Sequence, residues 1–328
     1  YERRLKAARL CTSSGVREMR EQCTNNGKKF PRRYAWIVNS EDSTGDHLEH
    51  TNNCRVCFDI SDSEHSAFLA RGYRLKDCMD GYGFLDAELA YEVQSSGRGS
   101  KMRFCVMSYF NSDIQYCEQC YNSSELFGCV GLNKKSYCIL NKHYTKEEYD
   151  VLVGKLVAHM KETGEYGEFF PVALWPFGYN ETLASEYYPL TREQALAKGY
   201  HWQDAMPGSH GKETMALDDV PDDISVVAED IVRHVLACSS CGKNYKIIKQ
   251  EFEFYKKLLH PIPRLCPDCR HAERMSLRAP RKLFRRQCTC DRAGHEHTGR
   301  CATEFETTYS PDRLETVYCE SCYQQEVV

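Results

Sequence analysis

The sequence lacks the long apolar runs that a helical membrane protein needs. No stretch approaches the ~18 consecutive apolar residues of a membrane span, and no charged-then-apolar segment typical of secretion opens the chain. These absences argue against a membrane protein and lead us to expect a cytoplasmic location. Aromatic residues (12%) and hydrophobic residues (41%) are abundant enough to build packed cores, so the composition also excludes a disordered chain.

The signatures of common enzyme classes are missing too. There is no GxSxG elbow, no Walker loop and no GxGxxG loop. A zinc deaminase places HxE before PCxxC, whereas here His271-Ala272-Glu273 follows the Cys266 and Cys269 pair. We therefore expect a non-catalytic protein, although 19 Cys and 12 His leave a Cys/His nucleophilic pair open.

Cysteine, by contrast, is plentiful, and its clearest pattern lies between residues 238 and 269. Cys238/Cys241 and Cys266/Cys269 are two CxxC pairs, with the stretch 242–265 between them. Each pair puts two thiolates on a tight turn, and two such turns supply the four tetrahedral sulfur ligands that Zn²⁺ prefers. This spacing predicts a zinc finger over residues 238–286, against the alternative of four unrelated buried thiols.

A second cysteine module occupies residues 287–328. Cys319 and Cys322 form a clear knuckle, and a strand-turn-strand pattern precedes them. Cys301 stands directly before that hairpin, where a first knuckle belongs. The other ligand of that knuckle is either Cys290, which we prefer, or Cys288, and His297 is the reserve ligand. We therefore expect two zinc ions in the chain, and a reducing compartment fits metal-bound thiolates better than a disulfide scaffold does.

Charge is distributed unevenly along the chain. Residues 242–286 carry 13 basic and 4 acidic residues, whereas residues 34–241 carry 17 basic and 32 acidic residues. Such a basic finger suits a nucleic-acid backbone, RNA or DNA; the alternative is an acidic protein partner. Arg270, Arg274 and Arg278 follow helical spacing and share one face. The candidate phosphate-binding residues are Lys243, Lys246, Arg270, Arg274, Arg278, Arg281, Lys282, Arg285 and Arg286.

Residues 46–142 have a different sequence pattern, in which short runs rich in Val, Ile, Phe, Tyr and Cys alternate with polar clusters. Asn111, Asn122 and Asn133 recur at intervals of 11 residues. One strand per such interval predicts either a β-solenoid, which we prefer, or an antiparallel meander, with a wall that could bind a protein partner. Core packing is favoured over a zinc site for the cysteines of this region, which are Cys54, Cys57, Cys117, Cys120, Cys129 and Cys138.

The remaining segments complete an α+β, multidomain architecture: a β-rich repeat, a small helical region, then two treble-clef or zinc-ribbon modules. Residues 1–45 are interpreted as the basic N-terminal segment of a module truncated upstream. Residues 143–205 are expected to be helical, beginning with a capping box at Thr145 and Glu148. Residues 206–237 are interpreted as an acidic linker with a short helix. The helical region is expected to pack on the β-rich wall through Trp175, Phe177, Tyr187, Tyr188 and Trp202.

The motif CSSCGKNYKIIKQEFEFYKKLLHPIPRLCPDCR resembles the probable zinc-ribbon (treble-clef) zinc-finger family. The matching features are the CxxCGK knuckle, a Glu-Phe-Tyr segment, a Pro-x-Pro step and CxxCR, over about 40 residues. More loosely, the whole arrangement is similar to uncharacterised multi-zinc-finger proteins predicted from bacterial metagenomes. The resemblance implies zinc at Cys238, Cys241, Cys266 and Cys269 and implies no enzymatic activity.

Overall fold

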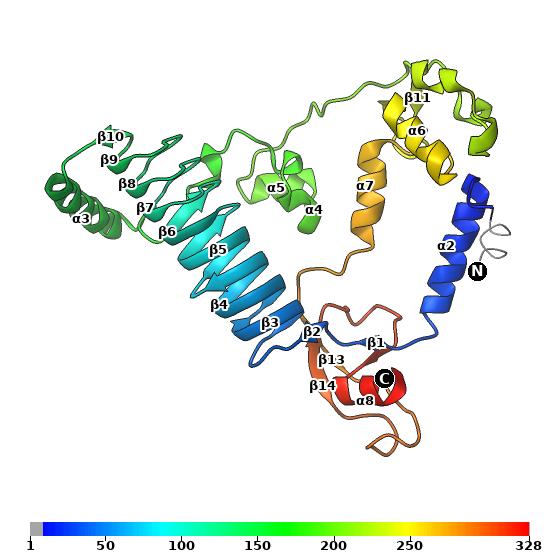
Figure 1. The fold of residues 1–328 in the computed structure, drawn as a ribbon, viewed down its shortest axis with the longest axis horizontal. Coiled ribbons are helices and arrows are strands. Elements are labelled where there is room, and N and C mark those ends of the chain that lie inside the picture. Colours follow the sequence, from blue (N-terminus) through cyan, green and yellow to red (C-terminus); the bar gives the residue numbers. More distant parts are fainter. Residues whose placement is uncertain (1–8, 328) are drawn as a thin grey trace. The chain divides into compact units, whose positions relative to one another are not determined.

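The computed structural model describes residues 9–327, which form two compact units (Figure 1). The first unit consists of residues 9–31 and 177–279, and the second of residues 32–176 and 280–327. Each unit is therefore built from two stretches that are far apart in the sequence. The expected helical region 143–205 and the expected finger 238–286 are both divided between the units.

The second unit is dominated by a parallel β-solenoid, so the repeat is a solenoid and not a meander. Each strand pairs with its neighbour in the sequence. From Gly45↔Cys57 onward every coil advances the register by twelve positions, as in Ser100↔Ser112, Ser112↔Ser124 and Ser124↔Ser136, whereas the first pairing, Ile37↔Leu48, advances it by eleven. The repeat predicted from the asparagines is therefore one position too short. The parallel strands are β2 (Ile37–Val38), β3 (Gly45–Arg55), β4 (Cys57–Lys76), β5 (Met79–Gln94), β6 (Gly97–Val106), β7 (Ser112–Gln115), β8 (Ser124–Phe127) and β9 (Ser136–Ile139).

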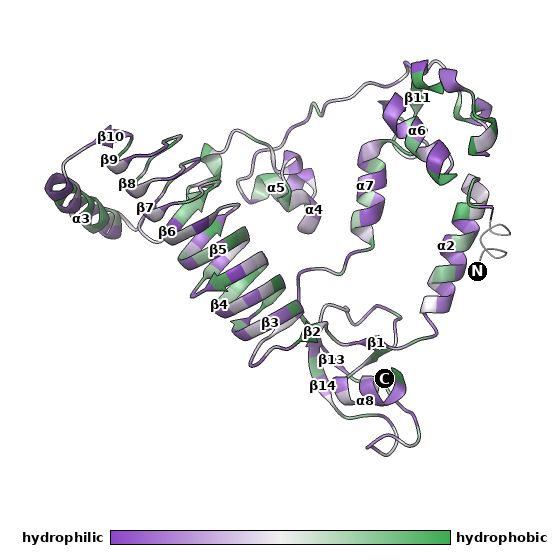
Figure 2. Cartoon of the chain, viewed as in Figure 1, coloured by the Kyte–Doolittle hydropathy of each residue, from purple (hydrophilic) through white to green (hydrophobic). Residues whose placement is uncertain are grey.

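The solenoid backbone follows a strict three-residue rule. From His47 to Leu140, every third residue has a positive φ, a left-handed conformation that is uncommon outside glycine. The residue after such a position points inward, as Leu48, Leu69 and Met102 do. Each coil therefore bends several times, once at every left-handed position. In Figure 2, hydrophobic and hydrophilic residues alternate along the strands β3–β6 accordingly.

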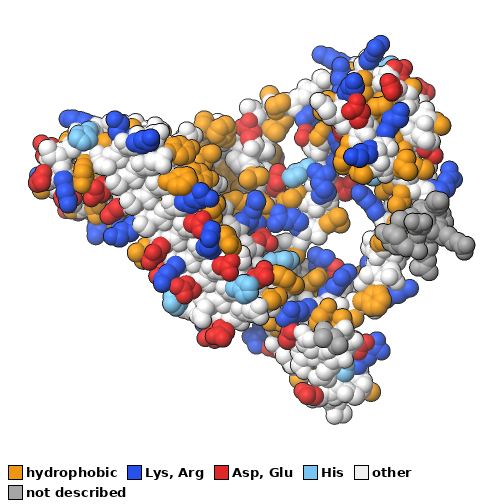
Figure 3. All heavy atoms as spheres, in the orientation of Figure 1, with side chains coloured by type: hydrophobic (Ala, Val, Ile, Leu, Met, Phe, Trp, Pro, Cys, Tyr) orange, Lys and Arg blue, Asp and Glu red, His pale blue; other side chains and the backbone are white. Residues whose placement is uncertain are grey.

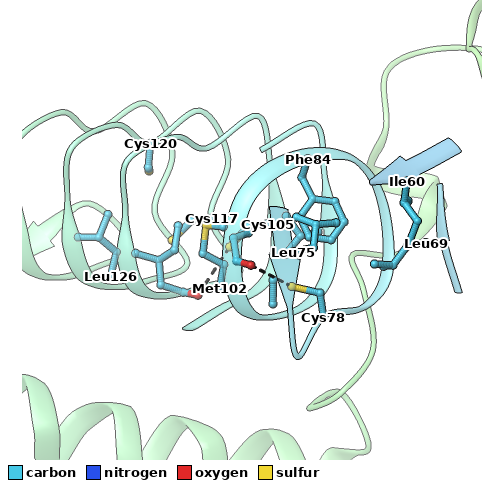
Figure 4. Close-up of a cluster of buried hydrophobic side chains, with 14 of the residues drawn as sticks. Ile60, Leu69, Leu75, Cys78, Phe84, Met102, Cys105, Cys117, Cys120 and Leu126 are labelled. Atoms are coloured by element: carbon cyan, nitrogen blue, oxygen red, sulfur yellow. Dashed lines mark hydrogen bonds between the residues drawn. The ribbon is translucent and has the colours of Figure 1, made fainter. Parts of the chain in front are cut away.

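Cysteine and serine side chains inside the solenoid are satisfied by hydrogen bonds between neighbouring coils. The Cys78 thiol donates to the Ala87 carbonyl at 3.4 Å, and Cys105 donates to Ile114 at 3.7 Å (Figure 4). Ser63 Oγ accepts the Leu75 amide at 3.1 Å. Buried polar groups are tolerated when they are paired in this way. All six cysteines assigned to core packing lie in this core: Cys54, Cys57, Cys117, Cys120, Cys129 and Cys138.

Charged residues form ladders on the outside of the solenoid, where acidic and basic side chains intermingle (Figure 3). Asp86 Oδ1 lies 2.7 Å from Arg74 Nε, and its Oδ2 lies 3.6 Å from Arg98 Nε. Lys76 and Glu64 pair at 3.0 Å. The partners in each pair are one coil apart in the sequence and lie on adjacent coils. The opposite charges on this surface therefore largely cancel.

Helix α3 (Lys146–Thr163) packs against the last coils, which end in β10 (Lys142–His143) antiparallel to β9. The predicted capping box at Thr145 and Glu148 is present. The aromatic contacts differ from those expected: α3 and residues 166–170 pack on Phe104, Tyr116 and Phe127. Four of the expected wall contacts belong instead to the first unit: Phe177, Tyr187, Tyr188 and Trp202.

In the first unit, α2 (Ser13–Gly27) contacts both the finger and the segment before it: Arg20 pairs with Glu273, and Ser13 N donates to Asp222 Oδ1 at 3.0 Å. Residues 206–237 are not a linker, because their apolar side chains are core residues: Val220 and Ile231 are buried in the same cluster as the finger's Phe252. The other elements are α4 (Ala184–Tyr187), α5 (Arg192–Ala197), four 3₁₀ turns (Tyr179–Glu181, Leu217–Asp219, Ile224–Val226 and Glu229–Arg233), β11 (Leu236–Ala237), β12 (Asn244–Tyr245), α6 (Lys249–Leu258) and α7 (Pro267–Ser276).

The C-terminal module adjoins the first coil of the solenoid within the second unit. It contains β13 (Phe284–Gln287) and β14 (Glu304–Thr307), which pair antiparallel, then β15 (Val317–Tyr318) and α8 (Glu320–Val327). Strand β1 (Arg32–Arg33) pairs in parallel with β15. The module is thereby tied to the chain segment that enters the solenoid.

Candidate metal centres and a basic cleft

The first cysteine centre is assembled by a hairpin and the start of a helix. Strands β11 and β12 flank the turn that carries Cys238 and Cys241, and Gly242 has the positive φ that this turn requires. Cys266 is the N-cap of α7, with Pro267 at the first helical position. The structure thus brings together the four cysteines that the sequence predicted, with their sulfurs within 4.8 Å of one another.

The geometry of this centre, together with the lowered pKa of one of its thiols, suits a thiolate-bound cation. Cys241 Sγ and Cys266 Sγ lie 3.8 Å apart, the edge length of a tetrahedron with metal–sulfur bonds of about 2.3 Å. Burial acts to raise the pKa of the Cys238 thiol, but backbone hydrogen bonds at Cys241, Cys266 and Ser240 outweigh it and lower that pKa to about 6. A thiolate at neutral pH is the form that binds metal.

The second centre joins Cys288, Cys301, Cys319 and Cys322, all of which are buried. This corrects our preference for Cys290. Thr289 exchanges hydrogen bonds with Val317, so Cys288 lies beside Cys319, whose amide donates to the Cys288 sulfur at 3.2 Å.

Its thiols also have the spacing of metal ligands, and hydrogen bonds favour the ionised form of one of them, Cys301. Cys301 Sγ and Cys319 Sγ lie 3.9 Å apart. Burial raises the pKa of Cys288 to about 11. Burial also opposes ionisation of Cys301, but hydrogen bonds from the side chain and backbone of Thr303 prevail and lower its pKa to about 6. Both centres could hold a metal ion.

The nine basic residues nominated from the sequence are divided between the two units. Lys243, Lys246, Arg270, Arg274 and Arg278 belong to the first unit, and Arg281, Lys282, Arg285 and Arg286 belong to the second. The basic block that is continuous in the sequence is therefore assigned to two separate units.

Several of the nine residues have structural partners. Arg270 Nη1 donates to Glu251 Oε1 at 2.9 Å and to the Tyr255 hydroxyl at 2.8 Å. Arg281 is only 7% exposed and donates to Asp59 Oδ2 at 2.9 Å. Of the remaining residues, Lys243 pairs with Asp268, Arg285 with Glu304, and Arg286 donates to the Ser310 carbonyl.

A basic cleft of about 730 Å³ lies in the first unit, between α2, α7 and residues 260–265. Exposed Arg17 and Arg20 of α2 line it together with Arg274 of α7. Arg20 Nη1 and Glu273 Oε1 form an ion pair of 2.7 Å, with the two side chains 65% and 46% exposed.

Sequence reasoning missed Arg17 and Arg20 as site residues. The available signal was the basic character of the segment 1–33, in which 10 positions are basic and 3 are acidic. The fold places described residues of that segment in the same unit as the basic finger.

Comparison with protein-family models and with curated proteins found no match for this chain. Within residues 9–327, no helix combines the length and the apolar character that crossing a membrane requires.

Proposed function

We propose that this chain is a zinc-stabilised, non-catalytic protein that binds the backbone of RNA or DNA through the cleft of its first unit. The proposal rests on one observation: two basic segments that are far apart in the sequence line the same cleft. Arg17 and Arg20 face the same cleft as Arg274, although the two segments lie near opposite ends of the sequence. Arginine is well suited to phosphate because its planar guanidinium donates two parallel hydrogen bonds.

Zinc is the metal that we assign to both four-sulfur centres. Four thiolates at tetrahedral spacing are typical of structural zinc sites, and they leave no coordination position open for a substrate. This supports a structural role for the metal rather than a catalytic one. The many free thiols of residues 9–327 suit a reducing, cytoplasmic environment. The resemblance of residues 238–269 to zinc-ribbon fingers agrees with this assignment.

The charges around the cleft are compatible with an exchangeable polyanion. The Arg20–Glu273 pair is exposed, so it contributes little stability and a phosphate group can replace the carboxylate. Arg264 and Arg270 also line the cleft, but the first donates to the Val220 carbonyl at 2.7 Å and the second is paired with Glu251. We therefore expect Arg17, Arg20 and Arg274 to make the phosphate contacts.

The test is equilibrium binding of the full chain to a generic single-stranded RNA and to duplex DNA, each at several salt concentrations. Because phosphate contacts release counterions, affinity should fall steeply with salt. The double variant R17E/R274E should bind at least about tenfold more weakly, and its salt dependence should be shallower by about two counterions.

A matched control separates a specific site from net charge. The variant K101E/K134E makes the same change in net charge on exposed residues of the solenoid. It should bind as the unmodified chain does. Equal weakening by both double variants, or no binding by the unmodified chain at low salt, would refute the proposed site.

The second candidate function is a protein-assembly scaffold, and a stripe of aromatic residues on the solenoid favours it. Tyr109 and Tyr121 stack at 6.2 Å, and Phe110 beside them is 50% exposed. Exposed aromatic residues are enriched in protein interfaces. If this function holds, a Tyr109→Ser and Phe110→Ser double variant should lose a protein partner in pull-downs, while R17E/R274E keeps it.

A further inference from the structure

The C-terminal module contains a second set of metal-binding side chains beside its four-sulfur centre. The donor atoms of Cys290, His295, His297 and Cys322 all lie within 4.8 Å of one another. Cys322 belongs to both sets, since its sulfur also lies within that distance of the other three sulfurs of the first set. Three residues of the new set are therefore additional to the centre already described.

His297 has a ring nitrogen that the protein itself leaves without a partner. Its Nδ1 lies 2.8 Å from the Gly299 carbonyl oxygen, which can only accept, so Nδ1 carries the proton. Nε2 then has a free lone pair, and it is buried without a hydrogen bond. Within residues 9–327, only one other buried side-chain nitrogen or oxygen, Arg270 Nε, is left in this state. A metal ion is the natural partner of a neutral imidazole held in this tautomer.

His295 is oriented in the same way by an acidic residue. Its side chain is 8% exposed, and its Nε2 lies 3.6 Å from Glu326 Oε2 on α8. Its other nitrogen, Nδ1, lies 3.2 Å from Cys290 Sγ. Histidine ligands of metals commonly donate their second N–H to a carboxylate, which turns the lone pair of the first nitrogen toward the ion.

We propose that this module is a two-metal cluster in which the Cys322 thiolate bridges two zinc ions. One ion is bound by Cys288, Cys301, Cys319 and Cys322. The other is bound by Cys290 Sγ, His295 Nδ1, His297 Nε2 and Cys322 Sγ. Two cysteines and two histidines at tetrahedral spacing form a typical zinc ligand set.

The charges of this cluster nearly balance. Five thiolates carry five negative charges against four positive charges from two Zn²⁺ ions, and both histidines remain neutral. The whole chain would then hold three zinc ions instead of two. This inference does not rest on nucleic-acid binding, because it concerns only the side chains of the module.

The experiment counts zinc per chain by native mass spectrometry of the full-length protein. We expect three ions in the unmodified chain and two in His297→Gln, which removes one ligand of the second ion and none of the first. The control His159→Gln, an exposed residue of α3, should retain three. Two ions in the unmodified chain, or three in His297→Gln, would overturn the proposal.

A second measurement does not depend on whether a variant folds. Both four-sulfur centres contain no nitrogen ligand, so imidazole scattering in the zinc X-ray absorption spectrum of the unmodified chain can come only from the proposed Cys₂His₂ ion. Its presence at about two histidines per three zinc ions supports the cluster, since that is the composition proposed here. An all-sulfur spectrum overturns it.

Discussion

Thr308 donates a buried hydrogen bond of 2.6 Å to Asp46 Oδ2, and so joins the C-terminal cysteine module to the first coil of the solenoid. The other carboxylate oxygen of Asp46 accepts the backbone amides of Trp36 at 2.8 Å and His47 at 2.9 Å. A single carboxylate therefore ties together three parts of the second unit: the entering segment, the solenoid and the cysteine module.

Replacing Thr308 with Val should destabilise the second unit by about 1–3 kcal/mol, because a buried carboxylate oxygen loses its hydroxyl donor. Urea denaturation of the full chain would show this as a lower midpoint for the solenoid and the module together. Thr316→Val leaves the Asp46 bond in place and should move the midpoint little. An unchanged midpoint for Thr308→Val would contradict the role of this bond.

Removal of metal should unfold the cysteine centres and spare the solenoid. Structural zinc supplies folding energy directly, so a strong chelator should expose residues 238–269 and 288–322 to hydrogen exchange. Amides within residues 45–143 should stay protected, since their hydrogen bonds run between coils. Cys238→Ser should reproduce the loss in the first centre only. Exchange that rises equally over the whole chain would show that the solenoid depends on metal.

The three-residue rule of the solenoid can be tested with neighbouring substitutions. Ile114 is fully buried. Ile114→Ala should lower the free energy of unfolding by about 2–5 kcal/mol, because it leaves a cavity inside the coil. Asp113, one position earlier, points outward with a positive φ, and Asp113→Ala should change stability by less than about 1 kcal/mol. Thermal unfolding of both variants measures the difference, and similar losses would contradict the inward period of three.

Arg281 should behave as a structural residue despite its place in the basic sequence block. Arg281→Met breaks the contact with Asp59 and should lower the stability of the second unit by about 1–3 kcal/mol. Nucleic-acid affinity at a temperature where the variant is folded should stay within about twofold, because the change lies outside the proposed cleft. A stable Arg281→Met variant that binds nucleic acid poorly would reverse this assignment.

The first four-cysteine cluster could be predicted from the sequence because its determinants are local. A CxxC pair fixes two ligands on one turn, and Gly242 and Pro267 mark the two turns. The sequence predicted only part of the second cysteine cluster. Cys288 and Cys290 are close neighbours in the sequence, and the pairing of Thr289 with Val317 decides between them, which is a contact across 28 residues.

The solenoid was predicted, but from a pattern that does not match its geometry. Asn111 is buried and its side-chain amide donates to Cys120, whereas Asn122 and Asn133 are exposed and contact each other at 3.2 Å. The interval between these asparagines therefore mixes inward and outward positions. The correct signal is a small or apolar residue at every third position, a period that matches neither an ordinary strand nor a helix.

The prediction of a linker before the finger was wrong, because it relied on the Asp, Pro and Gly content of the segment and not on the spacing of its apolar residues. Residues 206–223 are rich in Asp, Pro and Gly, yet Val220, Ile224, Val227 and Ile231 recur at intervals of three or four and form one buried set. The cleft could not be read from the sequence at all. Only tertiary structure brings Arg17 near Arg274.

The most direct test of the proposed function is to map where a nucleic acid touches the protein. The full chain should be cross-linked by ultraviolet light to a generic RNA at low salt, digested, and analysed by mass spectrometry. We predict cross-linked peptides from residues 13–27 and 255–276, where Tyr255 and His260 line the cleft. Cross-links confined to residues 45–143 would contradict this account, because they would place the nucleic acid on the solenoid.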